Sequence, residues 1–192
     1  MSIDGVILAA GFSERAGQFK PALDLGGKPL LVRCVESMTD VCDRIIVVAG
    51  FNFDRITELI GHLAKVSVVI NEKYELGMFS SVQCGIHEVT GKRFFIIPGD
   101  QPVVKTDTFR QLLAVDDDIV IPRYNGKKGH PVLFKSHLIP EILAMSDTAI
   151  LRDFIHSNEA IIIDVDDPGI GMDVDSLQDY EKVKAYYQKE MQ

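Results

Sequence analysis

The sequence lacks several features that would place the protein in other classes. Its three cysteines, Cys34, Cys42 and Cys84, form no CxxC pair, and so odd and sparse a set is typical of reduced thiols. No apolar run approaches the roughly 20 residues of a membrane span. The N-terminal MSIDGVIL has no basic segment and no cleavage site, so we expect no secretion signal and a cytoplasmic location.

The chain also has fewer basic than acidic residues, which argues against two kinds of partner. Its net charge is −8, with a pI near 5.1, so we expect no general binding to nucleic acid or to a membrane surface. The length of 192 residues, with 46% apolar and 25% charged residues, is that of an ordinary globular chain. We therefore expect a single domain over residues 1–192.

Short apolar runs that end at glycine or in polar turns alternate with amphipathic segments. This alternation predicts an α/β fold: a three-layer, doubly wound, mainly parallel sheet with helices on both faces. The predicted strands cover residues 6–10, 44–50, 65–70, 93–97, 118–121, 130–134 and 161–165. The predicted helices cover residues 30–38, 54–63, 77–89, 106–114, 136–145, 149–156 and the end of the chain from 177.

A long polar connection follows the first apolar run and combines glycines with two strong cations. It begins at Gly11 and contains Arg15, Gly17 and Lys20. Glycines let backbone N–H groups approach an anion, and long ordered connections are usually functional. These residue types together suit a polyphosphate, although an ordinary surface loop explains the composition about as well.

The segment LAAGFSERAGQFK, residues 8–20, resembles the signature L-A-A-G-x-S-x-R-x-G-x-x-K of the MobA-like nucleotidyltransferases. The resemblance is strongest to the molybdenum cofactor cytidylyltransferase branch. Ala16 departs from the pattern, because the family often has Met or Phe there. The resemblance implies a Rossmann fold of the nucleotide-diphospho-sugar transferase type and catalytic roles for Arg15 and Lys20. It also implies that the nucleotide contacts Leu8, Ala9, Ala10, Gly11, Arg15 and Lys20.

Two further segments resemble motifs of the same family. The Gly77–Ser81 segment reads locally as a helix start capped by serine, whereas the resemblance implies nucleotide contacts for Ser80 and Ser81. Gly99-Asp100-Gln101-Pro102 follows a buried strand, and an Asp there is often only a turn former. The resemblance implies that Gly99 and Asp100 contact the nucleotide and that Asp100 is catalytic and binds Mg²⁺.

The resemblance extends to the acceptor side and to the end of the chain. It implies that Gln101 and His130 contact the acceptor, although His130 suits a strand edge equally well. Arg152 lies in a partial match, and we favour a surface position for it. The D-V-D-S motif implies Asp175 as the second metal ligand, with Asp173 as the alternative, and Asp175 or Ser176 also suits a helix cap.

The resemblance implies transfer of CMP from CTP to the phosphate of molybdenum-loaded molybdopterin, with release of pyrophosphate. Leu8-Ala9-Ala10-Gly11 matches the cytidylyl branch, whereas the guanylyl branch has L-A-G-G, so we predict CTP over GTP. Mg²⁺ is the expected ion, with Mn²⁺ as an alternative, and a molybdenum hydroxylase is a candidate recipient of the product. Two other classes stay open: a transferase for a sugar or polyol phosphate, and a non-catalytic protein that hands the cofactor to a molybdenum enzyme.

Overall fold

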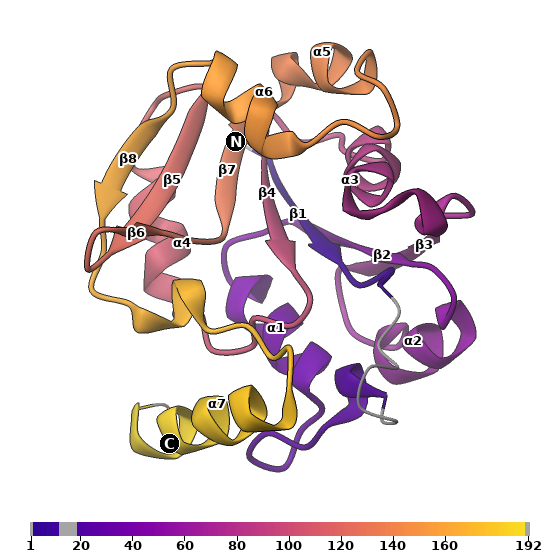
Figure 1. Cartoon of the computed structure of the whole chain (residues 1–192), viewed down its shortest axis with the longest axis vertical. Helices are drawn as coiled ribbons and strands as arrows, with labels where there is room; N and C mark the ends of the chain where they lie inside the picture. The colour runs from indigo at the N-terminus through magenta and orange to yellow at the C-terminus, as the bar shows by residue number, and fades with distance from the viewer. Residues whose placement is uncertain (1, 12–18, 191–192) are drawn as a thin grey trace.

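The computed structural model describes residues 2–11 and 19–190, and in these residues eight strands form one sheet. The strand order is β3-β2-β1-β4-β7-β5-β6, and β8 pairs with β5 (Figure 1). The strands are β1 (Ile3–Leu8), β2 (Arg44–Ala49), β3 (Val66–Ile70), β4 (Arg93–Pro98), β5 (Ile119–Tyr124), β6 (Lys127–Lys128), β7 (Val132–Lys135) and β8 (Ile161–Asp164).

Helices cover both faces of this sheet and make three layers. The α-helices are α1 (Leu30–Thr39), α2 (Phe53–Ile60), α3 (Met78–His87), α4 (Thr106–Leu113), α5 (Ile139–Leu143), α6 (Leu151–Ser157) and α7 (Leu177–Glu190). Short 3₁₀ helices are η1 (Lys20–Ala22), η2 (Tyr74–Leu76), η3 (Ser136–Leu138) and η4 (Pro168–Gly171). Helices α1, α2 and α4 pack on one face, and α3, α5 and α6 pack on the other.

The predicted doubly wound, mainly parallel sheet is confirmed. Strands β3, β2, β1 and β4 are mutually parallel, β7 is antiparallel to β4 and β5, and β8 is parallel to β5. Successive side chains of a strand point to opposite faces, so Val6 joins the core under α3 while Ile7 joins the core under α1. Burial on both faces is why these strands appear in the sequence as continuous apolar runs.

Several predicted boundaries shift, for local reasons. The strand predicted at residues 6–10 ends at Leu8, and the strand predicted from Lys65 begins at Val66, because Lys65 has a φ of 66°. The helix predicted at 54–63 ends at Ile60, and the segment 136–145 forms η3 followed by α5. Within the described residues, no helix is both long enough and apolar enough to cross a membrane.

The N-terminus of α4 is capped by a residue distant in sequence. The Thr106 hydroxyl, at the first residue of α4, donates to the carbonyl of Ser37 at 2.9 Å and does not cap the helix. The buried carboxylate of Asp167 accepts from the Lys105 N–H at 2.8 Å and from the Thr108 hydroxyl at 2.6 Å. Its other oxygen accepts from the Gly169 N–H at 2.9 Å, so one side chain joins α4 to η4.

We predict that Asp167→Asn lowers the free energy of unfolding by about 2 kcal/mol, because three donors lose a charged acceptor inside the protein. Chemical denaturation of the two proteins measures this difference. Asp166→Asn, at the exposed neighbouring position, is the matched control and should unfold like the wild type. Equal stability of the Asp167 and Asp166 variants would contradict this account of α4.

Candidate active site

The loops after β1 and β4 meet at the carboxyl edge of the sheet. Leu8 pairs with Pro98 at the ends of the two strands, and the Gly99 N–H donates to the Leu8 carbonyl at 2.9 Å. A Cβ at Gly99 would lie 3.2 Å from that carbonyl oxygen, so glycine allows this close approach. Open α/β sheets bind ligands at this edge, so the first loop and the Gly99–Pro102 turn form one site.

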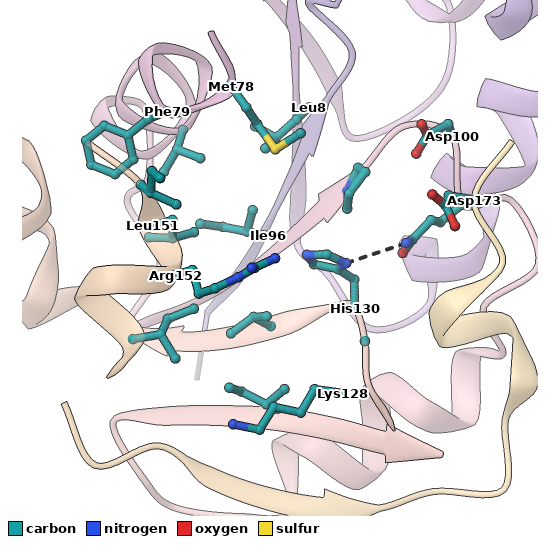
Figure 2. Close-up of a pocket in the computed structure, with 18 of the residues that line it drawn as sticks. Leu8, Met78, Phe79, Ile96, Asp100, Lys128, His130, Leu151, Arg152 and Asp173 are labelled. Carbon is teal, nitrogen blue, oxygen red and sulfur yellow. Dashed lines mark hydrogen bonds between the residues drawn. The ribbon is translucent and has the colours of Figure 1, made fainter. Parts of the chain in front are cut away.

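Three carboxylates lie around one point of this edge. The Val174 N–H donates to the Asp100 carbonyl at 3.0 Å and joins the segment before α7 to the turn after β4. Val174 is buried while Asp173 and Asp175 are exposed. Side chains two residues apart on extended backbone share one side, so both carboxylates face the cavity beside Asp100. Figure 2 shows Asp100 and Asp173 next to each other.

The surroundings of Asp100 disfavour its charged form. Burial raises the pKa of Asp100 to about 6, and the negative charges of Asp173 and Asp175 add to this effect, while Lys20 opposes it. The Asp100 Oδ1 atom is buried and has no hydrogen-bond partner among the described residues. The Lys20 Nζ lies 3.8 Å from Asp175 Oδ1.

The chemistry of these groups fits a hard divalent cation. Among the described residues, no group of three or more His, Cys, Asp or Glu side chains is arranged to hold a metal ion. Mg²⁺ does not need three protein ligands, because it commonly binds through one or two carboxylates together with phosphates and water. Asp100, with its unpartnered oxygen, meets that need, and both Asp173 and Asp175 lie near enough to affect its pKa.

The cap at α7 leaves Asp175 available for this role. The Ser176 hydroxyl accepts from the Asp179 N–H at 3.2 Å, and the Asp179 carboxylate accepts from the Ser176 N–H at 3.1 Å. This reciprocal pair satisfies the helix start. Ser176, rather than Asp175, is therefore the cap of α7.

The cavity at this edge has two lobes that share Asp100 and Asp175. The smaller lobe, of about 490 Å³, lies beside the first loop. Eight of the predicted nucleotide contacts line it: Leu8, Ala9, Ala10, Gly11, Lys20, Ser81, Gly99 and Asp100. Arg15, the other predicted cation, lies outside the described residues.

The two serines at the start of α3 have different surroundings. The Ser80 hydroxyl donates to the carbonyls of Lys73 and Gly77 and accepts from Asn71 Nδ2, and Ser80 does not line either lobe. Ser81 lines the smaller lobe, and its hydroxyl accepts from Asn71 Nδ2 at 3.0 Å. Ser81 is thus left with a proton to donate to a ligand, and the geometry favours it over Ser80 as the direct contact.

The larger lobe, of about 820 Å³, extends from Asp100 towards β6 and α6. Gln101 and His130, the predicted acceptor contacts, line it, and Gln101 Nε2 lies 3.5 Å from His130 Nδ1 (Figure 2). Burial lowers the pKa of His130 to about 4, so its ring is neutral at pH 7. The neutral ring and the Gln101 amide therefore offer both a donor and an acceptor to a ligand without adding charge.

From the sequence alone, no site role is assigned to four further residues that the structure places at this site. Asn71 holds both serines, whereas Lys128, Arg152 and His156 line the larger lobe. Arg152 is exposed, as expected, but it also faces the cavity. Two signals pointed to Arg152: its partial motif match and its four-residue spacing from His156, which puts both residues on one side of a helix.

These features define a class of protein. Two lobes meet at a carboxylate cluster on the carboxyl edge of a mixed sheet, and the fold is that of the nucleotide-diphospho-sugar transferases. The MobA-like NTP transferase domain model matches residues 5–161. The chain therefore belongs to the MobA-like NTP transferase family, whose members are nucleotidyltransferase enzymes.

Named relatives agree with this assignment. The chain is 26% identical over 187 residues to the molybdenum cofactor cytidylyltransferase of Escherichia coli K12, covering 97% of each chain. It is 28% identical over 141 residues to a probable molybdenum cofactor guanylyltransferase of Bacillus cytotoxicus, covering 71% of this chain and 69% of the relative. The crystal structure of Rv0371c of Mycobacterium tuberculosis H37Rv in complex with manganese superposes with a TM-score of 0.80 at 23% identity, covering 96% of this chain and 99% of that one.

The raised pKa of Asp100 predicts a specific pH dependence of stability. Because folding raises this pKa, the unfolded chain loses its proton first as the pH rises, and the folded state loses stability between about pH 4 and pH 6. Asp100→Asn removes this loss, so the variant should be more stable than the wild type at pH 8 by roughly 2–3 kcal/mol and similar to it at pH 4.

Urea denaturation at the two pH values measures the effect, and Glu159→Gln at an exposed position is the control. Added Mg²⁺ at pH 8 should stabilise the wild type but not Asp100→Asn. If the free energies of unfolding of the wild type and Asp100→Asn differed by the same amount at both pH values, the raised pKa of Asp100 would be contradicted.

Proposed function

We propose that the protein transfers CMP from CTP to the phosphate of molybdenum-loaded molybdopterin and releases pyrophosphate. The single observation that carries the proposal is that the two lobes share Asp100 at their boundary. A nucleotide in the smaller lobe then has its α-phosphate next to an acceptor phosphate in the larger one. We further propose that the whole chain acts as one transferase domain.

The reaction needs positioning and charge compensation rather than a general base. An acceptor phosphate oxygen, already anionic at neutral pH, attacks the α-phosphorus, and the bond to the bridging oxygen of pyrophosphate breaks with its electron pair. Lys20 and Arg15 would offset the charge that builds on the leaving pyrophosphate. Asp100, with Asp175 or Asp173, would hold Mg²⁺ or Mn²⁺, and the ion would supply charge stabilisation and orient the phosphates.

The choice of base rests on the first loop. Ala10 is 5% exposed and lines the smaller lobe, so its Cβ narrows the space beside the backbone where a base would lie. A glycine at this position would admit a larger ring. This geometry supports a preference for CTP over GTP, which the resemblance of the Ala-Ala-Gly segment also implies.

The decisive experiment incubates the purified protein with each NTP, Mg²⁺ and molybdenum-loaded molybdopterin, and measures pyrophosphate release and the nucleotidyl product. Parallel reactions contain a sugar phosphate or a polyol phosphate as the acceptor. We expect product with CTP and the pterin acceptor only. Transfer to a sugar or polyol phosphate alone would identify the other transferase class, and tight pterin binding without transfer would identify an accessory protein. A molybdenum hydroxylase as recipient and a cytoplasmic location stay predictions.

We predict that Lys20→Ala lowers turnover at least tenfold, because a charge-assisted phosphate contact contributes roughly 1.5–3 kcal/mol. Arg15→Ala should have an effect of the same size. Lys92→Ala, at an exposed residue before the amino end of β4, is the control. Steady-state kinetics of these variants measure the effect. If both Lys20→Ala and Arg15→Ala turned over at the wild-type rate, the proposed role of the first loop in catalysis would be wrong.

Alanine variants of the two adjacent serines form a matched pair that tests which hydroxyl contacts the nucleotide. Ser81→Ala should weaken CTP binding about fivefold, as one hydrogen bond contributes about 1 kcal/mol, with stability little changed. Ser80→Ala should instead lower stability, because the Ser80 hydroxyl joins Asn71 to two backbone carbonyls. Calorimetric CTP titration together with thermal unfolding separates these effects. The reverse pattern would assign the direct contact to Ser80.

A further inference from the structure

The charged side chains of the larger lobe are separated by sign. Its carboxylates are Asp100, Asp173 and Asp175, all at the end shared with the smaller lobe. Its strong cations are Lys128 on β6 and Arg152 on α6. Figure 2 shows Asp100 and Asp173 on one side of His130, and Arg152 and Lys128 on the other. The lobe therefore has an acidic end and a basic end.

The two cations at the basic end have no counter-ion among the residues that the structure describes. Neither Lys128 nor Arg152 forms an ion pair or a side-chain hydrogen bond with them. Several other exposed cations of the chain do form ion pairs, as in the contacts of Arg123 with Asp164 at 2.7 Å and of Lys73 with Asp147 at 2.8 Å. Although the chain has a net charge of −8, these two unpaired cations line the same lobe and leave this end of it positively charged.

The wall between the two ends is mainly apolar. Ile96, Ile121 and Val132 come from the sheet, and Leu151 and Ile155 come from α6. Gln101 and the neutral His130 add polar atoms without charge. A volume of about 820 Å³ lies within the range of about 300–1,000 Å³ that is typical of small-molecule pockets.

We propose that Lys128 and Arg152 form a second anion-binding subsite in the larger lobe, separate from the phosphate-transfer centre at Asp100. The ligand class is a phosphate monoester with a flat, weakly polar body and a second anionic group at its far end. The phosphate lies beside Asp100, the flat body lies against Ile96, Ile121 and Leu151, and the second anion contacts the two cations. The inference rests on the proposed function, because it identifies the larger lobe as the acceptor site.

Two probes that differ by one charge test the subsite without catalysis. These are 1-naphthyl phosphate and 5-sulfo-1-naphthyl phosphate, titrated by their fluorescence in the presence of Mg²⁺ and saturating CTP. An acidic protein should by default repel the additional sulfonate. With the subsite, the wild type should bind the sulfonated probe at least fivefold more tightly. The double variant Lys128→Gln/Arg152→Gln should lose this advantage and keep its affinity for the simpler probe.

Lys127→Gln is the matched control. It removes the same charge one residue away, and Lys127 is exposed but does not line the lobe, because neighbouring side chains of a strand point to opposite faces. It should keep the full advantage, and CTP affinity should be equal in all variants. Equal binding of the two probes by the wild type, or an advantage that survives in the double variant, would overturn the proposal. Discrimination between the probes, together with no CMP transfer to molybdenum-loaded molybdopterin in the assay described above, would leave the subsite in place and reject the proposed function.

Discussion

The backbone hydrogen bond from Val174 to Asp100 joins two segments that lie far apart in the sequence, and the active edge is built around it. It brings Asp173 and Asp175 up to a carboxylate that is itself largely buried. Burial, together with the negative charges of Asp173 and Asp175, raises the pKa of Asp100, and the Asp100 Oδ1 atom has no hydrogen-bond partner among the described residues. The cluster persists because the core around Leu25, Leu30, Val174 and Tyr187 holds the segment in place. The fold thus retains a local electrostatic cost at the position where a cation and phosphates would relieve it.

The same edge organises the space on either side of Asp100. Towards β1, backbone groups and Lys20 surround a small lobe suited to a nucleotide. Towards β6 and α6, neutral polar groups and apolar walls lead to Lys128 and Arg152. Negative and positive side chains are therefore at opposite ends of the larger lobe. An anionic acceptor would be drawn in at the basic end, and it would meet the carboxylates only where a divalent ion could offset them.

Local patterns predicted the elements well and their ends less well. Apolar runs such as Ile45–Ala49 predicted buried parallel strands because a strand covered on both faces must be apolar throughout. The cap of α4 has no local signal in the sequence, because its partner is remote. Thr106 bonds to Ser37, while Asp167 satisfies the start of α4. Ser80 and Ser81 are identical in type and adjacent, yet the Ser80 hydroxyl donates to backbone carbonyls inside the protein while Ser81 lines the cavity.

The sequence by itself determined the fold class, the family and the residues of the signature segments, because those depend on periodicity and on contiguous motifs. It also located Asp100 just after a predicted strand and Lys20 in the first loop. Only the tertiary structure decided which carboxylates lie near Asp100, that Lys20 lies by Asp175, that His130 is neutral, and that Arg152 faces a cavity. Burial, distance and pKa depend on segments that become neighbours only when the chain folds, and no local pattern in the sequence encodes them.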